Sequence, residues 1–133
     1  MLIINEEEVK LIKQKIKVGS YIINGKQGYD VVISIQFKKN NKDGYICLSA
    51  GYELEKNINK FLNRVYKSVP FFDSKEEITL FEVFDTEHFY DTEIESEIYL
   101  NIKNIINNKI EVDFEVNDEL IKIKYNGLLN ITQ

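Results

Sequence analysis

Residues 110–125 read IEVDFEVNDELIKIKY, and this stretch decides most of what the sequence indicates about the fold. Apolar and charged residues alternate on both sides of Asn117-Asp118, which is the pattern of two half-buried strands joined by a tight turn. The stretch therefore predicts an antiparallel hairpin whose apolar residues share one face and whose opposite charges share the other. A two-residue turn predicts the pairs Phe114–Ile121, Val112–Ile123, Asp113–Lys122 and Glu111–Lys124.

Two further regions show strand patterns. Residues 29–37 alternate between apolar and polar, and the turn-forming run 40–44 separates them from a returning strand at 45–49. The single cysteine, Cys47, lies in that strand, where we expect it to act as a small hydrophobe rather than a nucleophile. Residues 78–84 are largely apolar on both faces, with Glu82 interrupting one of them, which favours a position inside the sheet.

Two segments have apolar residues at helical spacing. Residues 6–17 begin at a capping box formed by Asn5 and Glu8, so they predict a first helix. Residues 54–69 have apolar positions three, four and seven apart and end before Pro70, so they predict the most regular helix of the chain.

Residues 93–107 fit a helix and a strand equally well. The capping-box spacing of Thr92 and Glu95, and Asn107-Asn108 as a helix end, favour the helix. The expected fold is therefore α+β: a mainly antiparallel sheet of five or six strands with two or three helices packed on one face. With 133 residues and no low-complexity linker, residues 1–133 are expected to form a single domain.

The composition excludes several classes of function. One cysteine allows neither an intrachain disulfide nor a zinc site built on thiolates. The N-terminus lacks the pattern of a secretory signal, and no apolar run approaches the length of a membrane span, so we expect a cytoplasmic protein that does not bind a membrane. The net charge is −5 and Arg64 is the only arginine, which argues against direct binding of nucleic acid.

No nucleotide-binding, hydrolase or metalloprotease motif occurs, so we expect neither catalysis nor a bound metal or cofactor. The only histidine, His88, lies among Asp85, Glu87 and Asp91. Neighbouring carboxylates keep an imidazole charged, which is unfavourable for a general base. A small enzyme or cation-binding domain that uses His88 with these carboxylates is the alternative interpretation.

The negative charge is concentrated in one segment. Residues 73–97 hold ten acids and one base, whereas the rest of the chain holds twelve acids and sixteen bases. Aromatic residues lie between the acids, and protein interfaces favour aromatic anchors combined with complementary charge. The predicted partner-binding residues are Asp73, Glu76, Glu77, Asp85, Glu87, Phe89, Tyr90, Asp91, Glu93, Glu95 and Glu97.

An acidic surface of this kind fits a basic protein partner. In size, charge and lack of a catalytic signature, the chain resembles the immunity proteins that bacteria make against their own nuclease toxins. The resemblance implies a non-catalytic inhibitor that covers the active or substrate-binding surface of a basic toxin. The Ile-, Lys-, Asn- and Glu-rich composition is typical of an AT-rich bacterial or phage genome, so a phage inhibitor that imitates nucleic-acid charge is a further alternative.

Overall fold

The computed structural model describes residues 1–68, 76–84, 89–91 and 97–132, and for residues 89–91 it describes the backbone only. Within these ranges the chain forms ten strands and one turn of 3-10 helix, with no α-helix. The predicted α+β class is therefore wrong, because each segment expected to pack as a helix on the sheet is instead a strand or a short turn.

The strands belong to one sheet whose order is β5-β8-β9-β10-β1-β2-β3-β4-β6-β7. Neighbours pair antiparallel, and the end of β10 also pairs with β2 in parallel. The elements are β1 (Leu2–Ile4), β2 (Glu7–Ile23), β3 (Lys26–Lys39), β4 (Lys42–Glu53), the 3-10 turn η1 (Ile58–Phe61), β5 (Arg64–Lys67), β6 (Ile78–Phe84), β7 (Phe89–Asp91), β8 (Glu97–Ile106), β9 (Lys109–Asn117) and β10 (Lys122–Ile131).

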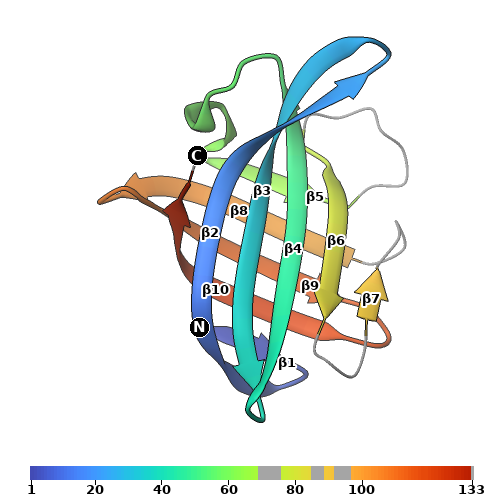
Figure 1. The fold of residues 1–133 in the computed structure, drawn as a ribbon, viewed down its shortest axis with the longest axis vertical. Coiled ribbons are helices and arrows are strands. Elements are labelled where there is room, and N and C mark those ends of the chain that lie inside the picture. Colours follow the sequence, from blue (N-terminus) through green and yellow to red (C-terminus); the bar gives the residue numbers. More distant parts are fainter. Residues whose placement is uncertain (69–75, 85–88, 92–96, 133) are drawn as a thin grey trace.

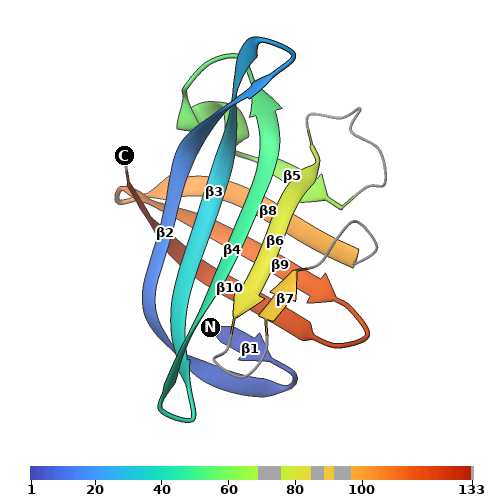
Figure 2. The ribbon, with the colours of Figure 1, turned by 45° about the vertical axis from the view of Figure 1, so that its right-hand side comes forward.

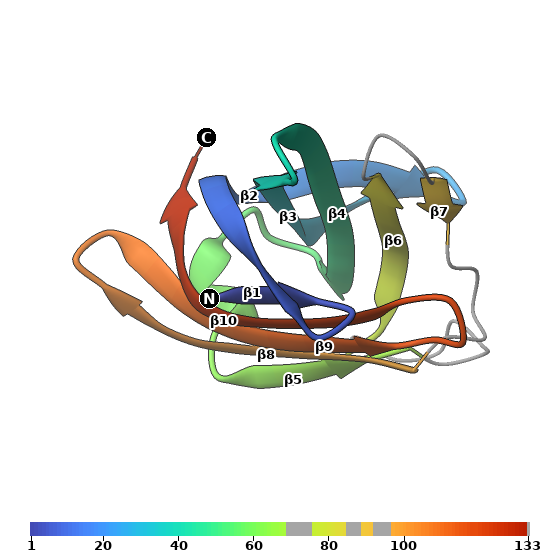
Figure 3. The ribbon, with the colours of Figure 1, turned by 90° about the horizontal axis from the view of Figure 1, so that it is seen from below.

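The sheet curls into a nearly closed barrel of two layers. Strands β2, β3, β4 and β6 form one layer, and β8, β9 and β10 cross steeply behind it (Figures 1 and 2). The view from below shows the two layers stacked (Figure 3). The ends of the sheet meet where Lys67 of β5 forms a bridge with Glu77, immediately before β6. Closure of this kind covers backbone groups that an open sheet edge exposes.

The space between the layers is filled with Ile, Val, Leu and Phe side chains. Tyr66 and Tyr125 are buried among them, and burial raises the pKa of each phenol to about 12. Each hydroxyl still donates a hydrogen bond of 3.2 Å to a backbone carbonyl, that of Phe61 for Tyr66 and that of Leu128 for Tyr125. The core is thus apolar, and both of these buried hydroxyl groups have a hydrogen-bond partner.

The helix predicted at 6–17 is wrong because a β-bulge imitates helical spacing. Leu11 pairs with Phe37 and Lys13 pairs with Gln36, so Ile12 is one extra residue in β2. The extra residue changes which positions face inward, from odd numbers before the bulge to even numbers after it. Val9 and Ile16 are therefore both buried, seven residues apart, within one strand.

The helix predicted at 54–69 is also wrong. Only η1 is helical, and the residues that follow it form β5, which pairs with β8. Asn63 has φ 56°, a left-handed conformation that ends the helical turn. Phe61 and Tyr66 both reach the core from this connection. Val69 and Pro70 lie outside the described residues.

The helix preferred at 93–107 is strand β8 in its described part. Ile98, Leu100 and Ile102 are buried in alternation, as the strand alternative required. Asn107 and Asn108 form the turn to β9 instead of a helix end. The proposed capping residues Thr92 and Glu95 lie outside the described residues.

The predicted hairpins are confirmed as strand pairs, but their turns differ. Strands β3 and β4 turn at Asn40-Asn41, so Gly44 lies inside β4. In the C-terminal hairpin, Lys122 pairs with Asn117 and Tyr125 pairs with Phe114, a register four residues from the predicted one. A shift by an even number keeps every side chain on its predicted face, so the apolar set still faces the core.

Asparagine carries four two-residue turns of the barrel. Both central residues have positive φ at Asn5-Glu6, Asn24-Gly25, Asn40-Asn41 and Asn107-Asn108. Positive φ at both positions is what the type I′ hairpin turn requires, and asparagine tolerates it better than other residues with a side chain. These turns match the twist of the strands that they join.

Replacing Asn107 with valine is expected to lower the free energy of unfolding by about 1 to 2 kcal/mol, because a β-branched residue is strained at the φ of 52° found there. Urea denaturation followed by circular dichroism measures the loss. The matched control is Asn126→Val, an exposed strand position in β10, where valine suits the backbone. Equal losses in the two variants would contradict the turn assignment.

Candidate functional site

The structure describes only part of the predicted acidic surface. Glu76, Glu77 and Glu97 are described fully, and the backbones of Phe89, Tyr90 and Asp91 form β7. Strand β7 and the beginning of β8 lie on the same side of the barrel (Figures 1 and 2). The remaining predicted residues lie outside the described part of the chain: Asp73, Asp85, Glu87, Glu93 and Glu95.

The described acids take different roles. Glu77 is only 4% exposed, and its backbone carbonyl accepts a 2.8 Å hydrogen bond from Gly51 at the closure of the barrel. The Glu76 carbonyl accepts from the Lys67 amide in the same place. Glu97 is exposed at the start of β8. Glu77 therefore contributes to closure, and its side chain is not part of an exposed surface.

A different set of residues gathers on the outer face of the β2-β3-β4-β6 layer. The strand register places side chains of one face in rows that run across the layer. One row consists of Lys13, Gln36, Tyr45 and Phe84. The next consists of Lys15, Ser34, Cys47 and Glu82, and Glu82 pairs onward with Asp91 of β7. The face is therefore basic along β2, and Glu82 places a carboxylate on it at β6.

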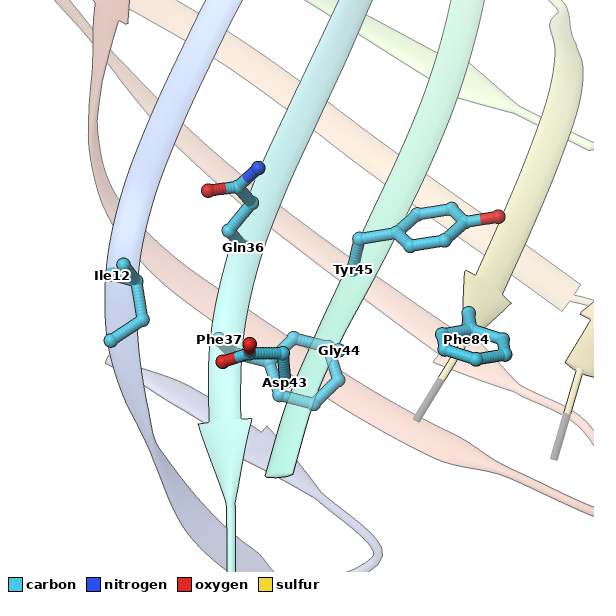
Figure 4. Close-up of a pocket in the computed structure, with 7 residues that line it drawn as sticks. All are labelled: Ile12, Gln36, Phe37, Asp43, Gly44, Tyr45 and Phe84. Carbon is cyan, nitrogen blue, oxygen red and sulfur yellow. The ribbon is translucent and has the colours of Figure 1, made fainter. Parts of the chain in front are cut away.

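The first row contains a hollow of about 400 Å³. The rings of Tyr45 and Phe84 stack with their centroids 5.6 Å apart and an interplanar angle of 22°. Ile12, the bulged residue, is 47% exposed, and Tyr45 is 37% exposed. Figure 4 shows the residues that line the hollow, which are Ile12, Gln36, Phe37, Asp43, Gly44, Tyr45 and Phe84. We call these seven residues the aromatic hollow.

Gly44 allows the aromatic hollow to form. A Cβ atom on Gly44 would lie 2.5 Å from the ring carbon Cζ of Phe37 and 2.7 Å from the backbone oxygen of Phe84. The missing side chain therefore lets the buried Phe37 ring come close beneath the hollow. Asp43 pairs with Lys38 at 3.9 Å, but both side chains are largely exposed, so this ion pair holds Asp43 only weakly.

Cys47 lies in the middle of the outer face, between Ser34 and Glu82. Partial burial raises the pKa of its thiol, and the neighbouring Glu82 carboxylate raises it further. The thiol is therefore protonated at neutral pH, and the thiolate is the nucleophilic form. This environment does not suit nucleophilic catalysis.

Sequence reasoning did not identify the aromatic hollow, because its residues come from four strands that only the fold brings together. It placed Ile12 on the buried face of a helix, whereas the bulge turns this side chain outward. Phe84 lies within the acidic segment 73–97 that the sequence analysis singled out, but its partner Tyr45 lies outside that segment. The available signal was an isoleucine, Ile12, and a tyrosine, Tyr45, at outward-facing positions of strands that otherwise alternate regularly.

The alternative centred on His88 falls outside the described residues, as do Asp85 and Glu87. In the part of the chain that the structure describes, no three His, Cys, Asp or Glu side chains gather to hold a metal ion. Within the same ranges no helix has the length and apolar character needed to cross a membrane. Comparison with known proteins matched this chain to no protein-family model, no curated protein and no solved structure.

Proposed function

We propose that this protein is a non-catalytic inhibitor that binds a basic protein, of the kind with which bacteria neutralise their own nuclease toxins. The observation that carries the proposal is the position of the aromatic hollow at the acidic side of the sheet. The exposed ring of Tyr45 stacks on the half-buried ring of Phe84, one row away from Glu82, which pairs with Asp91 at the last strand of the sheet.

This arrangement supports protein binding on energetic grounds. Aromatic side chains that fill a partner's pocket account for most of the energy of an interface, and the surrounding polar rim excludes water. Acids beside them attract a basic partner and orient it before contact. The chain around β7 is acidic on both sides, since residues 85–97 contain six acids and no lysine or arginine. The inhibitor would act by covering the partner's substrate-binding surface.

The proposal is tested by using the whole chain as bait for proteins of its own source and of neighbouring genes. The expected result is a basic protein that binds at low salt, dissociates at high salt and degrades nucleic acid until the chain is added. Neutralising four acids, with Glu87→Gln, Asp91→Asn, Glu93→Gln and Glu95→Gln, is expected to slow association and weaken its salt dependence.

A second variant separates the aromatic contact from the charge. Tyr45→Ala is expected to weaken the complex about 30-fold or more, which is the usual effect of removing a central aromatic anchor. Leu128→Ser is the matched control, because Leu128 is similarly exposed, at 41%, but lies on β10. Recovery of no basic protein, or equal binding by all variants, would refute the proposed function.

A further inference from the structure

Three lysines follow one another on the outer face of β2. Lys13, Lys15 and Lys17 occupy alternate positions after the bulge, so their side chains leave the strand on the same side. They pair across to Gln36, Ser34 and Val32 of β3.

These lysines line a second hollow, of about 410 Å³. Its other lining residues are Val32, Ser34, Gln36 and Thr132. Thr132 is held in place because its amide donates a 2.9 Å hydrogen bond to the Ile16 carbonyl, where the end of β10 pairs with β2. Two hydroxyl-bearing residues and one residue with a side-chain amide therefore line the same space as the three lysines. We call this site the lysine hollow.

The positive charge of the lysine hollow is poorly compensated. Among the described residues, no carboxylate lies within ion-pair distance of Lys13 or Lys15. The charge of Lys13 lowers the pKa of Lys15, as two neighbouring cations do when no anion separates them. Lys103 on the other layer shows the opposite case, since Asp113 at 2.7 Å and Glu111 at 3.5 Å raise its pKa.

The neighbouring charges limit the size of a ligand. Beyond Lys17, the next outward residue of β3 is Asp30, opposite Gly19. Beyond Gln36, the aromatic hollow contains Asp43. A long polyanion lying along this face would therefore meet the Asp30 carboxylate beyond Lys17, whereas Asp43 at the other end is paired with Lys38. A compact anion avoids Asp30.

We propose that the lysine hollow binds the phosphate groups of a small ligand. Several oxygens with more than one negative charge can accept hydrogen bonds from two or three ammonium groups, from the hydroxyls of Ser34 and Thr132, and from the Gln36 amide. A single carboxylate would leave part of this positive charge uncompensated. The site is independent of the proposed inhibitor function and uses other residues, apart from Gln36.

The test is calorimetric titration of the whole protein with pyrophosphate, inorganic phosphate and acetate at equal ionic strength. The expected order of affinity is pyrophosphate, then phosphate, then acetate, with saturation at one site. Lys13→Gln with Lys15→Gln is expected to weaken pyrophosphate binding about tenfold or more, since each variant removes a charge-assisted hydrogen bond. Ser34→Val is expected to weaken it less, while leaving every charge in place.

The matched control removes the same charge elsewhere. Lys122→Gln with Lys124→Gln changes two exposed lysines of β10 and is expected to leave pyrophosphate affinity within about twofold, because exposed charges at a distance are screened. A lack of saturable binding would overturn the proposal. An equal loss of pyrophosphate affinity in the control variant would also overturn it, because that result would indicate a general charge effect. Equal affinity for acetate would overturn it too, because that result would exclude selectivity for phosphate.

Discussion

Replacing Arg64 with methionine is expected to lower the free energy of unfolding by about 2 to 3 kcal/mol and the Tm by roughly 8 to 12 °C. The Arg64 guanidinium lies 3.6 Å from the Glu53 carboxylate, whose side chain is only 8% exposed. Removing the cation leaves a buried carboxylate without this counter-charge. The effect of a fully buried pair would be larger, but Arg64 is 31% exposed and water screens part of it.

The location of this ion pair explains why its loss affects the whole barrel. Arg64 begins β5, and its charge lowers the pKa of the buried Tyr66 against the larger effect of burial, while Glu53 ends β4. The pair therefore links two strands beside the bridge between Lys67 and Glu77 that closes the sheet. Thermal unfolding followed by circular dichroism measures the change in Tm.

Two further variants identify the cause of that loss. Adding Glu53→Gln to Arg64→Met is expected to recover part of the stability, because a neutral amide then replaces the buried carboxylate. Lys124→Met breaks an exposed pair with Glu115 and is expected to cost less than about 1 kcal/mol. Equal losses for Arg64→Met and Lys124→Met would show that the Arg64–Glu53 pair does not stabilise the closure.

Strand patterns, and alternation above all, were the reliable signal in this sequence. The strands predicted at 29–37, 45–49, 78–84 and 110–125 all exist. Alternation identifies the buried face but not the partner, so a register error of four residues in the C-terminal hairpin left that face unchanged. The register itself depends on a loop at 118–121 that is longer than the two-residue turn expected from the sequence.

The failed helix predictions have a common physical cause. The bulge at Ile12 shifts the alternation of β2 by one residue, and the resulting spacing of Val9, Ile12 and Ile16 matches a helix. The asparagines of two hairpin turns were also misinterpreted. The sequence analysis assigned Asn5 as a helix cap and Asn107-Asn108 as a helix end. Asparagine favours all three settings, and only the strands on either side distinguish a hairpin turn.

The candidate sites were less predictable than the strands. Clustering of acids in residues 73–97 could be counted directly, but the buried side chain of Glu77 shows that a count does not place a residue at the surface. The aromatic hollow and the lysine hollow each combine residues far apart in the sequence. Ile12 and Phe84 line one hollow although 72 positions separate them, and this proximity follows from strand order.

Replacing Gly51 with alanine is expected to lower the free energy of unfolding by about 2 to 4 kcal/mol, from backbone strain and crowding together. Gly51 has φ 86°, a value that residues with a Cβ atom rarely adopt. The added Cβ would lie 3.0 Å from Cε1 of Phe61 and 3.1 Å from Cε1 of Tyr66. Both rings are buried and have little room to move.

Gly28→Ala provides the matched comparison on the outer face of the same layer. Its Cβ would lie 2.5 Å from Cε2 of Tyr52, which is closer than the contacts at Gly51. The Tyr52 ring is only partly buried and can rotate outward, so this variant is expected to lose no more than about 1 kcal/mol. Urea denaturation of both variants gives the comparison. Equal losses of stability in Gly28→Ala and Gly51→Ala would mean that crowding alone explains both. The positive φ of Gly51, whose amide donates a hydrogen bond to the Glu77 carbonyl, would then not be needed to close the barrel.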